Sequence, residues 1–226
     1  MFDRISPKYD FLNRLLSAGI DQQWRKKLIR LMRRQQPQRI LDIATGTGDL
    51  ALMQARRLSP QEVTGLDLSE GMLEVARKKV AKAGLTDKVK LVQGDAENLP
   101  FPDGSFDAVS VAFGVRNFED LEAGIREMHR ILSDDGQMYI LEFSQPEKSP
   151  FKQLYGFYSK KILPFIGKLI SGDASAYTYL PQSIAAFPYG ERMKRIILQN
   201  GFDEVEIYPL TFGIATIYVA KKKSDA

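Results

Sequence analysis

The sequence predicts an α/β fold with one mostly parallel sheet of seven strands and helices on both faces. Short apolar runs alternate with amphipathic stretches of helical period along most of the chain. This alternation favours parallel strands joined by right-handed crossover helices. The chain has 226 residues, of which 44% are hydrophobic. That is enough for one well-buried core, so we expect residues 1–226 to form a single domain.

Two helices are expected before the first strand, forming a helical cover over residues 2–34. The apolar face of the first consists of Phe11, Leu12, Leu15 and Leu16. The apolar face of the second consists of Trp24, Leu28, Leu31 and Met32. Gly19 is expected to end the first helix and Asp21 to cap the second, because glycine stops helices and aspartate accepts from their first free N–H groups.

Residues 38–143 are expected to contain the first five strands. We place these strands at residues 39–44, 62–68, 88–95, 106–113 and 137–143. Helices are expected between them at residues 48–58, 70–83 and 121–132. Ser69 is placed to cap the second of these helices and Gly84 to end it. The fourth strand is nearly all apolar, as is typical of a strand covered on both faces.

Residues 151–188 interrupt this alternation. Their composition is too apolar for a solvated linker, so we expect a helical insertion between strands five and six. A helix at 189–200, closed by Asn200 and Gly201, then leads to strands at 203–210 and 214–222. Residues 189–221 would therefore close the domain with one helix and the last two strands.

Composition argues against several classes of protein. The net charge is +4 with no long basic block, so we expect no nucleic-acid partner. There is no cysteine, which excludes disulfides, thiolate metal sites and a cysteine nucleophile. The N-terminus lacks the pattern of a secretory signal, and no apolar run approaches the ~20 residues that span a bilayer. We expect a cytoplasmic protein.

A glycine-rich turn, "LDIATGTGDLA" at residues 41–51, joins the first strand to its helix. Gly46 and Gly48 would let the backbone approach a ligand closely, next to the free N–H groups of the helix N-terminus. Asp67 ends the next strand, where a carboxylate can accept from both ribose hydroxyls. The alternative, in which no ligand binds, is a tight strand-to-helix turn beside a solvated acid.

Two ligands fit this turn. "GTGDLA" matches the Gly-x-Gly-x-x-Ala form of the dinucleotide fingerprint, so a nicotinamide or flavin enzyme is one interpretation. The other is S-adenosylmethionine, a nucleoside ligand without a pyrophosphate. Asp95 and Ala96 follow the third strand, where a carboxylate can accept from the adenine amino group and a backbone N–H can donate to the ring. A dinucleotide enzyme has no need of that pair, which favours S-adenosylmethionine.

Four stretches together resemble the class I S-adenosylmethionine-dependent methyltransferases: residues 42–48, Asp67, "GDAENLPFPDGSFD" and "MHRILSDDGQMYILEF". The resemblance implies a single Rossmann-like domain. Ala44 stands where that family has its first glycine, so one contact to the methionine moiety is expected to differ in detail. Residues 8–26, 112–118 and 157–188 further resemble the ubiquinone/menaquinone C-methyltransferases, and the match runs from residue 2 to about residue 220.

The resemblance implies a set of cofactor contacts: Asp42, Ala44, Gly46, Thr47, Gly48, Asp67, Leu68, Asp95, Ala96, Ala112 and Phe113. The glycine-rich turn would hold the methionine moiety, Asp67 the ribose, and Asp95 with Ala96 the adenine. Ala112 and Phe113 would form the floor below the sulfonium. Because a sulfonium is already a good leaving group, no metal is expected.

The implied reaction methylates a ring carbon of a prenylated demethylquinol. The wording "FGVRNFEDLEAGI" favours a menaquinone-type acceptor, 2-demethylmenaquinol. The alternatives are a ubiquinone-pathway benzoquinol, another small apolar acceptor, or, on the same glycine-rich turn, a nicotinamide-dependent reductase.

Arg116 and Asn117 are the candidate catalytic residues, because they follow strand four at the sheet edge where open α/β sheets bind ligands. Arg116 would hold negative charge on a quinol oxygen, and Asn117 would orient the ring. Alternatively, Arg116 caps a loop and pairs with Glu119 or Asp120. His129 lies within a helix and is interpreted as a surface or packing residue.

The base is left open among a water relayed by Arg116 and four side chains: Tyr9, Asp10, Tyr158 and Asp173. Tyr9, Phe157, Tyr158 and Asp173 are also tentative acceptor-binding residues. Within the insertion, an apolar groove for the quinol would be lined by Phe157, Tyr158, Ile162, Leu163, Phe165 and Ile166.

Four lysines of the insertion would face anionic lipid: Lys152, Lys160, Lys161 and Lys168. Each is worth ~1 kcal/mol near a charged surface. Transient contact with a membrane surface is therefore expected. The alternative is a helical pair packed on the sheet, with its lysines solvated. Residues 2–20 are expected to close over the cofactor from the other side and to keep water from it.

Overall fold

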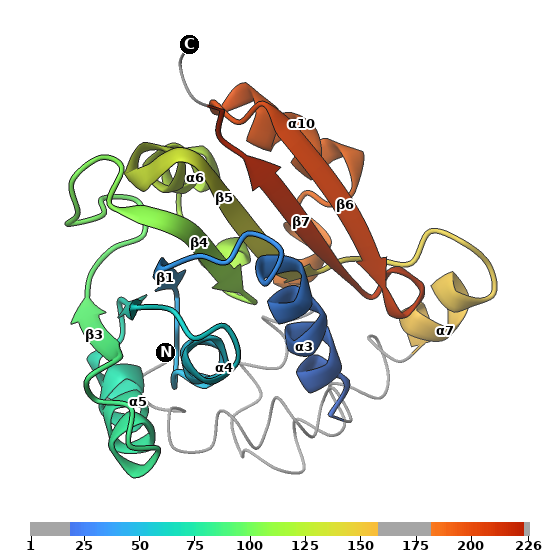
Figure 1. Cartoon of the computed structure of the whole chain (residues 1–226). Helices are drawn as coiled ribbons and strands as arrows, with labels where there is room; N and C mark the ends of the chain where they lie inside the picture. Colours follow the sequence, from blue (N-terminus) through green and yellow to red (C-terminus); the bar gives the residue numbers. More distant parts are fainter. Residues whose placement is uncertain (1–18, 158–181, 224–226) are drawn as a thin grey trace.

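The computed structural model describes residues 19–157 and 182–223, and it shows a seven-stranded sheet (Figure 1). The strands are β1 Arg39–Ile43, β2 Glu62–Asp67, β3 Val89–Gln93, β4 Phe106–Ala112, β5 Leu132–Phe143, β6 Glu204–Leu210 and β7 Ala215–Lys221. The helices are α3 Ile20–Met32, α4 Asp49–Arg57, α5 Glu70–Lys82, α6 Leu121–Ile131, α7 Phe151–Phe157 and α10 Glu191–Gln199. Short 3-10 turns, η2 Val115–Asn117 and η4 Thr211–Gly213, follow β4 and β6.

The strand order is β3-β2-β1-β4-β5-β7-β6, and only β7 runs antiparallel to its neighbours among these strands. The predicted mostly parallel α/β sheet is therefore confirmed. The order reverses direction between β1 and β4, so the carboxyl ends of β1, β2 and β4 meet beside that switch point. In open α/β sheets this is the edge that binds ligands.

Helices cover both faces of the sheet and bury two apolar clusters. On one face, Trp24 and Leu28 of α3 pack with Leu50 of α4 and Ile40 of β1. On the other face, Met128 of α6 lies in one cluster with Ile197 of α10 and strand residues that include Val109 and Ile140. These helical layers cover the two faces of the sheet. The edge formed by the carboxyl ends of the strands lies between them.

The predicted apolar face of α3 is confirmed, because Trp24, Leu28, Leu31 and Met32 are all buried. The predicted cap was wrong. Gly19, with φ of +76°, occupies the N-cap position, and Asp21 lies inside the first turn. There it binds Arg25, with 2.5 Å between Oδ2 and Nη1. Asp21 does not cap α3, because its carboxylate pairs with Arg25 one helical turn further along.

Other predicted boundaries hold within a few residues. Ser69 caps α5 by accepting from the N–H of Met72 at 3.2 Å, and Gly84 follows that helix with φ of +66°. The fifth strand begins earlier than expected, at Leu132 in place of Gln137. The extra residues form an irregular stretch. Phe106 of β4 pairs with Leu132 of β5, whereas Ala108, only two residues later, pairs with Gln137.

The described residues contain no helix that is both long and apolar enough to cross a membrane. The predicted insertion between β5 and β6 contributes α7 and a helical stretch at residues 182–186. The remainder of the insertion and the first predicted helix lie outside the described residues.

Candidate active site

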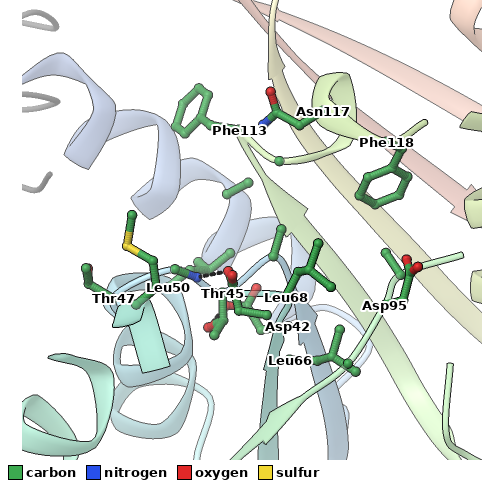
Figure 2. A pocket seen from close by; sticks show the side chains of 18 of the residues that line it. Asp42, Thr45, Thr47, Leu50, Leu66, Leu68, Asp95, Phe113, Asn117 and Phe118 are labelled. Atoms are coloured by element: carbon green, nitrogen blue, oxygen red, sulfur yellow. Dashed lines mark hydrogen bonds between the residues drawn. The ribbon is translucent and has the colours of Figure 1, made fainter. Parts of the chain in front are cut away.

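A cavity of about 280 Å³ lies at the carboxyl ends of β1, β2 and β4 and beside the loop that follows β3. Figure 2 shows Phe113, Asn117 and Phe118 along one side of this cavity and Thr47, Thr45 and Asp42 along the other. All of the predicted cofactor residues except Gly48 line it. The sheet topology thus brings together residues that are widely separated in the sequence.

The glycine-rich turn is anchored to the end of β2. The N–H of Gly46 donates to Oδ2 of Asp67 at 2.7 Å, and φ of Gly46 is +57°. Gly48, with φ of +80°, is the N-cap of α4, and a Cβ there would lie 3.2 Å from Cβ of Ala76. Gly48 therefore sets the close packing of α4 on α5, and Gly46 shapes the wall of the cavity.

Asp67 is held in place by backbone donors on both sides. Its Oδ1 accepts from the N–H of Ser69 at 2.9 Å, while Oδ2 accepts from Gly46. The carboxylate lines the cavity at the end of β2. Each oxygen has a second lone pair, so the group can accept further hydrogen bonds from a bound diol.

Asp42 lies at the bottom of the cavity and is almost fully buried. Its two oxygens accept from Ser110 Oγ at 2.6 Å and from Thr45 Oγ1 at 2.7 Å. Gln54 Nε2 in turn donates to Ser110 Oγ at 2.7 Å. Burial raises the pKa of Asp42 to about 6, and the two hydroxyl hydrogen bonds oppose that rise.

The loop after β3 supplies the opposite wall. Asp95 lines the cavity next to Ala96, and its Oδ1 accepts from the N–H of Glu97 at 2.9 Å. Leu68 also lines the cavity, and 70% of its surface is exposed. An exposed leucine beside two carboxylates suits a flat, partly apolar ring with polar edges.

Two residues of the cavity floor adopt left-handed backbone conformations that non-glycine residues rarely take. Ala44, after β1, has φ of +51°, and Phe113, after β4, has φ of +61°. Strain of this kind costs ~1–3 kcal/mol per residue and is concentrated at functional sites. A Cβ on Gly114 would lie only 2.4 Å from Cβ of Ala44, so the two strand ends meet closely.

The two candidate catalytic residues are placed differently. Asn117 lines the cavity, whereas Arg116 is not among the lining residues. The Arg116 guanidinium donates through Nη1 to Oε1 of Glu142 at 2.9 Å and to the carbonyl of Phe113. The two side chains are 7% and 0% exposed. Arg116 therefore pairs with Glu142, in place of the Glu119 or Asp120 considered from the sequence.

His129 lies in α6 with its ring against Phe202 in an edge-on arrangement, which is the packing role predicted for it. Tyr9, Asp10, Tyr158 and Asp173 lie outside the described residues. Phe157 ends α7, and its side chain is likewise not described. Their assignments to the acceptor or to the base stay predictions.

Sequence reasoning missed several residues that line the cavity, above all Arg25, Glu97, Phe118 and Glu119. The charged ones give the cavity its electrostatic character. Its acidic lining residues are Asp42, Asp49, Asp67, Asp95, Glu97 and Glu119. Asp49 is neutralised by Lys79, with 2.7 Å between Oδ1 and Nζ. Among the described lining residues Arg25 is the one basic side chain, so the cavity favours a cationic ligand.

The side chains that line the cavity suit the expected donor, S-adenosylmethionine. A sulfonium and an ammonium group would meet carboxylates, a ribose would meet Asp67, and an adenine would meet Asp95 and Leu68. A pyrophosphate would meet the same carboxylates and be repelled. The residues therefore fit the sulfonium donor better than a dinucleotide. No group of three or more potential metal-ligating side chains occurs among the described residues.

Comparison with known proteins agrees with this assignment. The model of the ubiE/COQ5 methyltransferase family matches residues 1–222 of the chain. The demethylmenaquinone methyltransferase of Bacteroides fragilis is 50% identical over 222 residues, which cover 98% of this chain and 91% of that protein. The ubiquinone/menaquinone biosynthesis C-methyltransferase UbiE of Geotalea uraniireducens is 48% identical over 223 residues, which cover 98% of this chain and 94% of that protein.

Solved structures show the same fold. The mmp1179 protein of Methanococcus maripaludis superposes with a TM-score of 0.70 at 22% sequence identity, and the match covers 100% of this chain and 96% of that chain. At this level of identity the likeness supports the fold alone. The likeness to the two relatives above extends over nearly the full length of both chains.

Proposed function

Because the chain belongs to the ubiE/COQ5 methyltransferase family, we propose that it methylates a ring carbon of a prenylated demethylquinol with S-adenosylmethionine as the donor. The acceptor that we favour is 2-demethylmenaquinol. The relative from Bacteroides fragilis carries the name demethylmenaquinone methyltransferase, and half of its aligned residues are identical. The UbiE relative, named for both quinones, keeps a benzoquinol acceptor as the second candidate.

The single observation that carries the choice of donor is the charge of the cavity. Asp67, Asp95 and Glu97 line it, and among the described lining residues Arg25 is the one basic side chain. Such a lining stabilises a sulfonium–ammonium ligand and disfavours the doubly charged pyrophosphate of a nicotinamide cofactor. Asp67 would bind the ribose hydroxyls, Asp95 and Ala96 the adenine, and Gly46 with Thr47 the methionine moiety.

When bound there, the sulfonium supplies an electrophilic methyl carbon, and the chain contributes position and charge. Ala112 and Phe113 would form the floor on which the reacting groups meet, at the ~3–3.5 Å separation that methyl transfer requires. Asn117, on the cavity wall, would orient a quinol oxygen. The new carbon–carbon bond forms as the carbon–sulfur bond breaks. A quinol hydroxyl gives its proton to a base, for which Tyr9, Asp10, Tyr158, Asp173 and a water relayed by Arg116 stay candidates, and the methylated ring carbon then releases its own proton as the ring regains aromaticity.

Arg116 would stabilise the phenolate that makes the ring carbon nucleophilic. Its charge is balanced by Glu142 behind the cavity wall. The Arg116 guanidinium would therefore act on a quinol oxygen in one of two ways. It would act through the adjacent Asn117, or directly, after its ion pair with Glu142 has loosened. Both routes require the Arg116 charge to be retained next to the acceptor.

Two measurements test the proposed function. Calorimetry should detect S-adenosylhomocysteine binding and no binding of NADH, and the variant Asp67→Asn should weaken the former. Mass spectrometry should then detect methylation of demethylmenaquinol at a higher kcat/KM than that of a demethylated benzoquinol. Binding of NADH without S-adenosylhomocysteine would overturn the proposal, and a preference for the benzoquinol would reassign the acceptor.

We further propose that the enzyme contacts a membrane surface to reach its prenylated acceptor. The side chain of Phe212, in η4, is 67% exposed and stacks on Phe151 of α7 with 3.6 Å between ring centroids. Lys148 and Lys152, three residues before and one residue after Phe151 in the sequence, are exposed. An exposed aromatic ring beside lysines suits the interface of an anionic bilayer.

A further inference from the structure

Arg25 is a buried cation on the wall of an otherwise acidic cavity. It lies in the second turn of α3 and is only 9% exposed. Its guanidinium carbon lies 5.4 Å from the centre of the Phe113 ring, on the cavity floor. Arg25 is therefore close to the point where the methionine moiety is expected, beside the glycine-rich turn.

Within the described residues, the hydrogen-bond partner of the Arg25 guanidinium is Asp21. Nη1 donates to Oδ2 of Asp21 at 2.5 Å. Nε is fully buried and has no hydrogen-bond partner among residues 19–157 and 182–223. A guanidinium carries five N–H donors, and leaving a buried donor of a charged group unpaired is unfavourable. A site that holds such a cation in a cavity is prepared for an anion.

The donor has one anionic group that could meet this cation. Its sulfonium and ammonium are positive and suit the carboxylates of the cavity, whereas its α-carboxylate would be repelled by them. We propose that Arg25 binds the α-carboxylate of the donor's amino-acid moiety and that Asp21 positions Arg25 for that contact. This inference rests on the proposed function, because it assigns a further group of the same ligand.

The competing explanation is that the Arg25–Asp21 pair only stabilises the first turns of α3. A buried pair of this kind is by itself weak evidence for stability. A helix-stabilising role also gives no reason for Arg25 to line the cavity, or for its buried Nε to stay unpaired within the described part of the chain. The two explanations differ in one measurable respect, which is whether the effect of Arg25 depends on the ligand's carboxylate.

The test compares two ligands by calorimetry: S-adenosylhomocysteine and its decarboxylated analogue, 5′-deoxy-5′-(3-aminopropylthio)adenosine. The full chain should bind the first more tightly. Arg25→Gln should weaken S-adenosylhomocysteine binding by ~10–100-fold, the loss expected for a charged hydrogen bond. Its affinity for the decarboxylated analogue should stay within about twofold of the wild type. Arg25→Lys should recover part of the difference, since lysine keeps the charge without the planar fork.

Lys26→Gln is the matched control, because Lys26 is the neighbouring cation on α3 and does not line the cavity. It should leave both affinities unchanged. Equal losses for the two ligands in Arg25→Gln, or no loss for S-adenosylhomocysteine, would overturn the inference. If Arg25→Gln fails to fold, the same ligand comparison in Arg25→Lys decides. Should the wild type bind neither ligand, the proposed function itself fails, which is a different result.

Discussion

Ala44 and Gly114 form a size-matched pair of residues beneath the cavity. The left-handed backbone of Ala44, with φ of +51°, carries strain. Gly114 has no Cβ at the point where one would lie 2.4 Å from Cβ of Ala44. The methyl group of Ala44 is thus accommodated because Gly114 has no side chain.

Exchanging these two residues tests that match. Gly114→Ala should lower the free energy of unfolding by about 1–3 kcal/mol, because the new methyl group overlaps that of Ala44. The double variant Ala44→Gly/Gly114→Ala should regain most of the loss, since the overlap disappears and the left-handed position receives a glycine. Urea unfolding of the wild type, Ala44→Gly, Gly114→Ala and the double variant measures this coupling. A double variant that is less stable than Gly114→Ala would show that the two positions do not compensate each other.

Asp42 makes stability depend on pH. Its folded-state pKa is raised by burial from 3.8 to about 6, so the protonated form is favoured in the folded protein. The associated stability is fully present below pH ~4 and is lost as the pH rises through about 6. Relative to Asp42→Asn, the wild type should lose about 3 kcal/mol of unfolding free energy over this window.

Urea unfolding of wild type and Asp42→Asn at pH 4.5, 5.5 and 7 measures the difference directly. The stability difference between the two proteins should shift in favour of the variant as the pH rises. An unchanged difference across this range would mean that Asp42 ionises at its ordinary pKa despite its burial.

At the scale of elements, the segment from β4 to η2 is tied to β5 by one buried ion pair. Glu142 of β5 accepts from the backbone N–H of Arg116 and from its guanidinium, and the guanidinium also reaches the Phe113 carbonyl. This arrangement holds Phe113 in its left-handed conformation and keeps Asn117 on the cavity wall. The same pair also carries the charge proposed to act on the quinol.

Structural and catalytic roles of Arg116 can be separated with two variants. Arg116→Met should cost about 3–5 kcal/mol of unfolding free energy, because it leaves the Glu142 carboxylate buried and unpaired. Arg116→Met/Glu142→Leu should regain much of this stability, since no buried charge remains. In this double variant kcat should still be reduced by about 10²–10³-fold, the usual effect of losing one stabilising group for a developing oxyanion.

Binding of S-adenosylhomocysteine by the double variant should stay close to that of the wild type, which serves as the control for an intact cofactor site. Recovery of kcat together with stability would show that Arg116 only holds the loop. The measurements needed are urea unfolding, calorimetry and single-turnover methylation.

The order and type of these elements followed from sequence patterns, whereas details set by tertiary contacts did not. Apolar runs and turn residues predicted all seven strands and the Ser69 cap. Asp21 was misplaced as a cap because its partner, Arg25, offered a better contact inside the helix. The early start of β5 depends on an irregular pairing with β4, which the spacing of apolar residues does not reveal.

At the scale of the whole molecule, the part of the candidate site that lies at the strand ends could be predicted from the sequence. The glycine-rich turn, Asp67 and Asp95 follow consecutive strands, so their meeting at one sheet edge could be inferred. Arg25 and Glu119 come from elements outside this pattern. The charge of the cavity is a sum over side chains from several elements, and it could be read only once the fold had placed them.

The fold also connects the cavity to the stacked rings of Phe151 and Phe212, which are proposed to meet the membrane. η4 joins β6 to β7 at the same sheet edge as the cavity, because Ala215 of β7 pairs with Phe143 at the carboxyl end of β5. Trp24 of α3 donates from Nε1 to Thr211 Oγ1 at 2.8 Å, and its ring lies 6.1 Å from that of Phe113. In Figure 1, α7 lies beside this tip of the β6–β7 hairpin.

Removing the exposed ring should therefore weaken membrane contact without changing the site. Phe212 has φ of +58°, a conformation that asparagine tolerates well. Phe212→Asn should accordingly fold normally, yet flotation with anionic phospholipid vesicles should recover several-fold less of it, since burying a phenylalanine side chain contributes about 1.5–3 kcal/mol. The control is Leu198→Asn, which removes another exposed apolar side chain, on α10.

Methylation should respond to the same change in a substrate-dependent way. A long-tailed acceptor presented in vesicles should be methylated more slowly by Phe212→Asn, whereas a short-tailed acceptor in solution should be methylated at the wild-type rate. Since the cavity residues are unaltered, the rate difference would come only from access to the lipid phase. Equal flotation of Phe212→Asn and the wild type, or equal losses for both acceptors, would remove η4 and α7 from the membrane-binding surface.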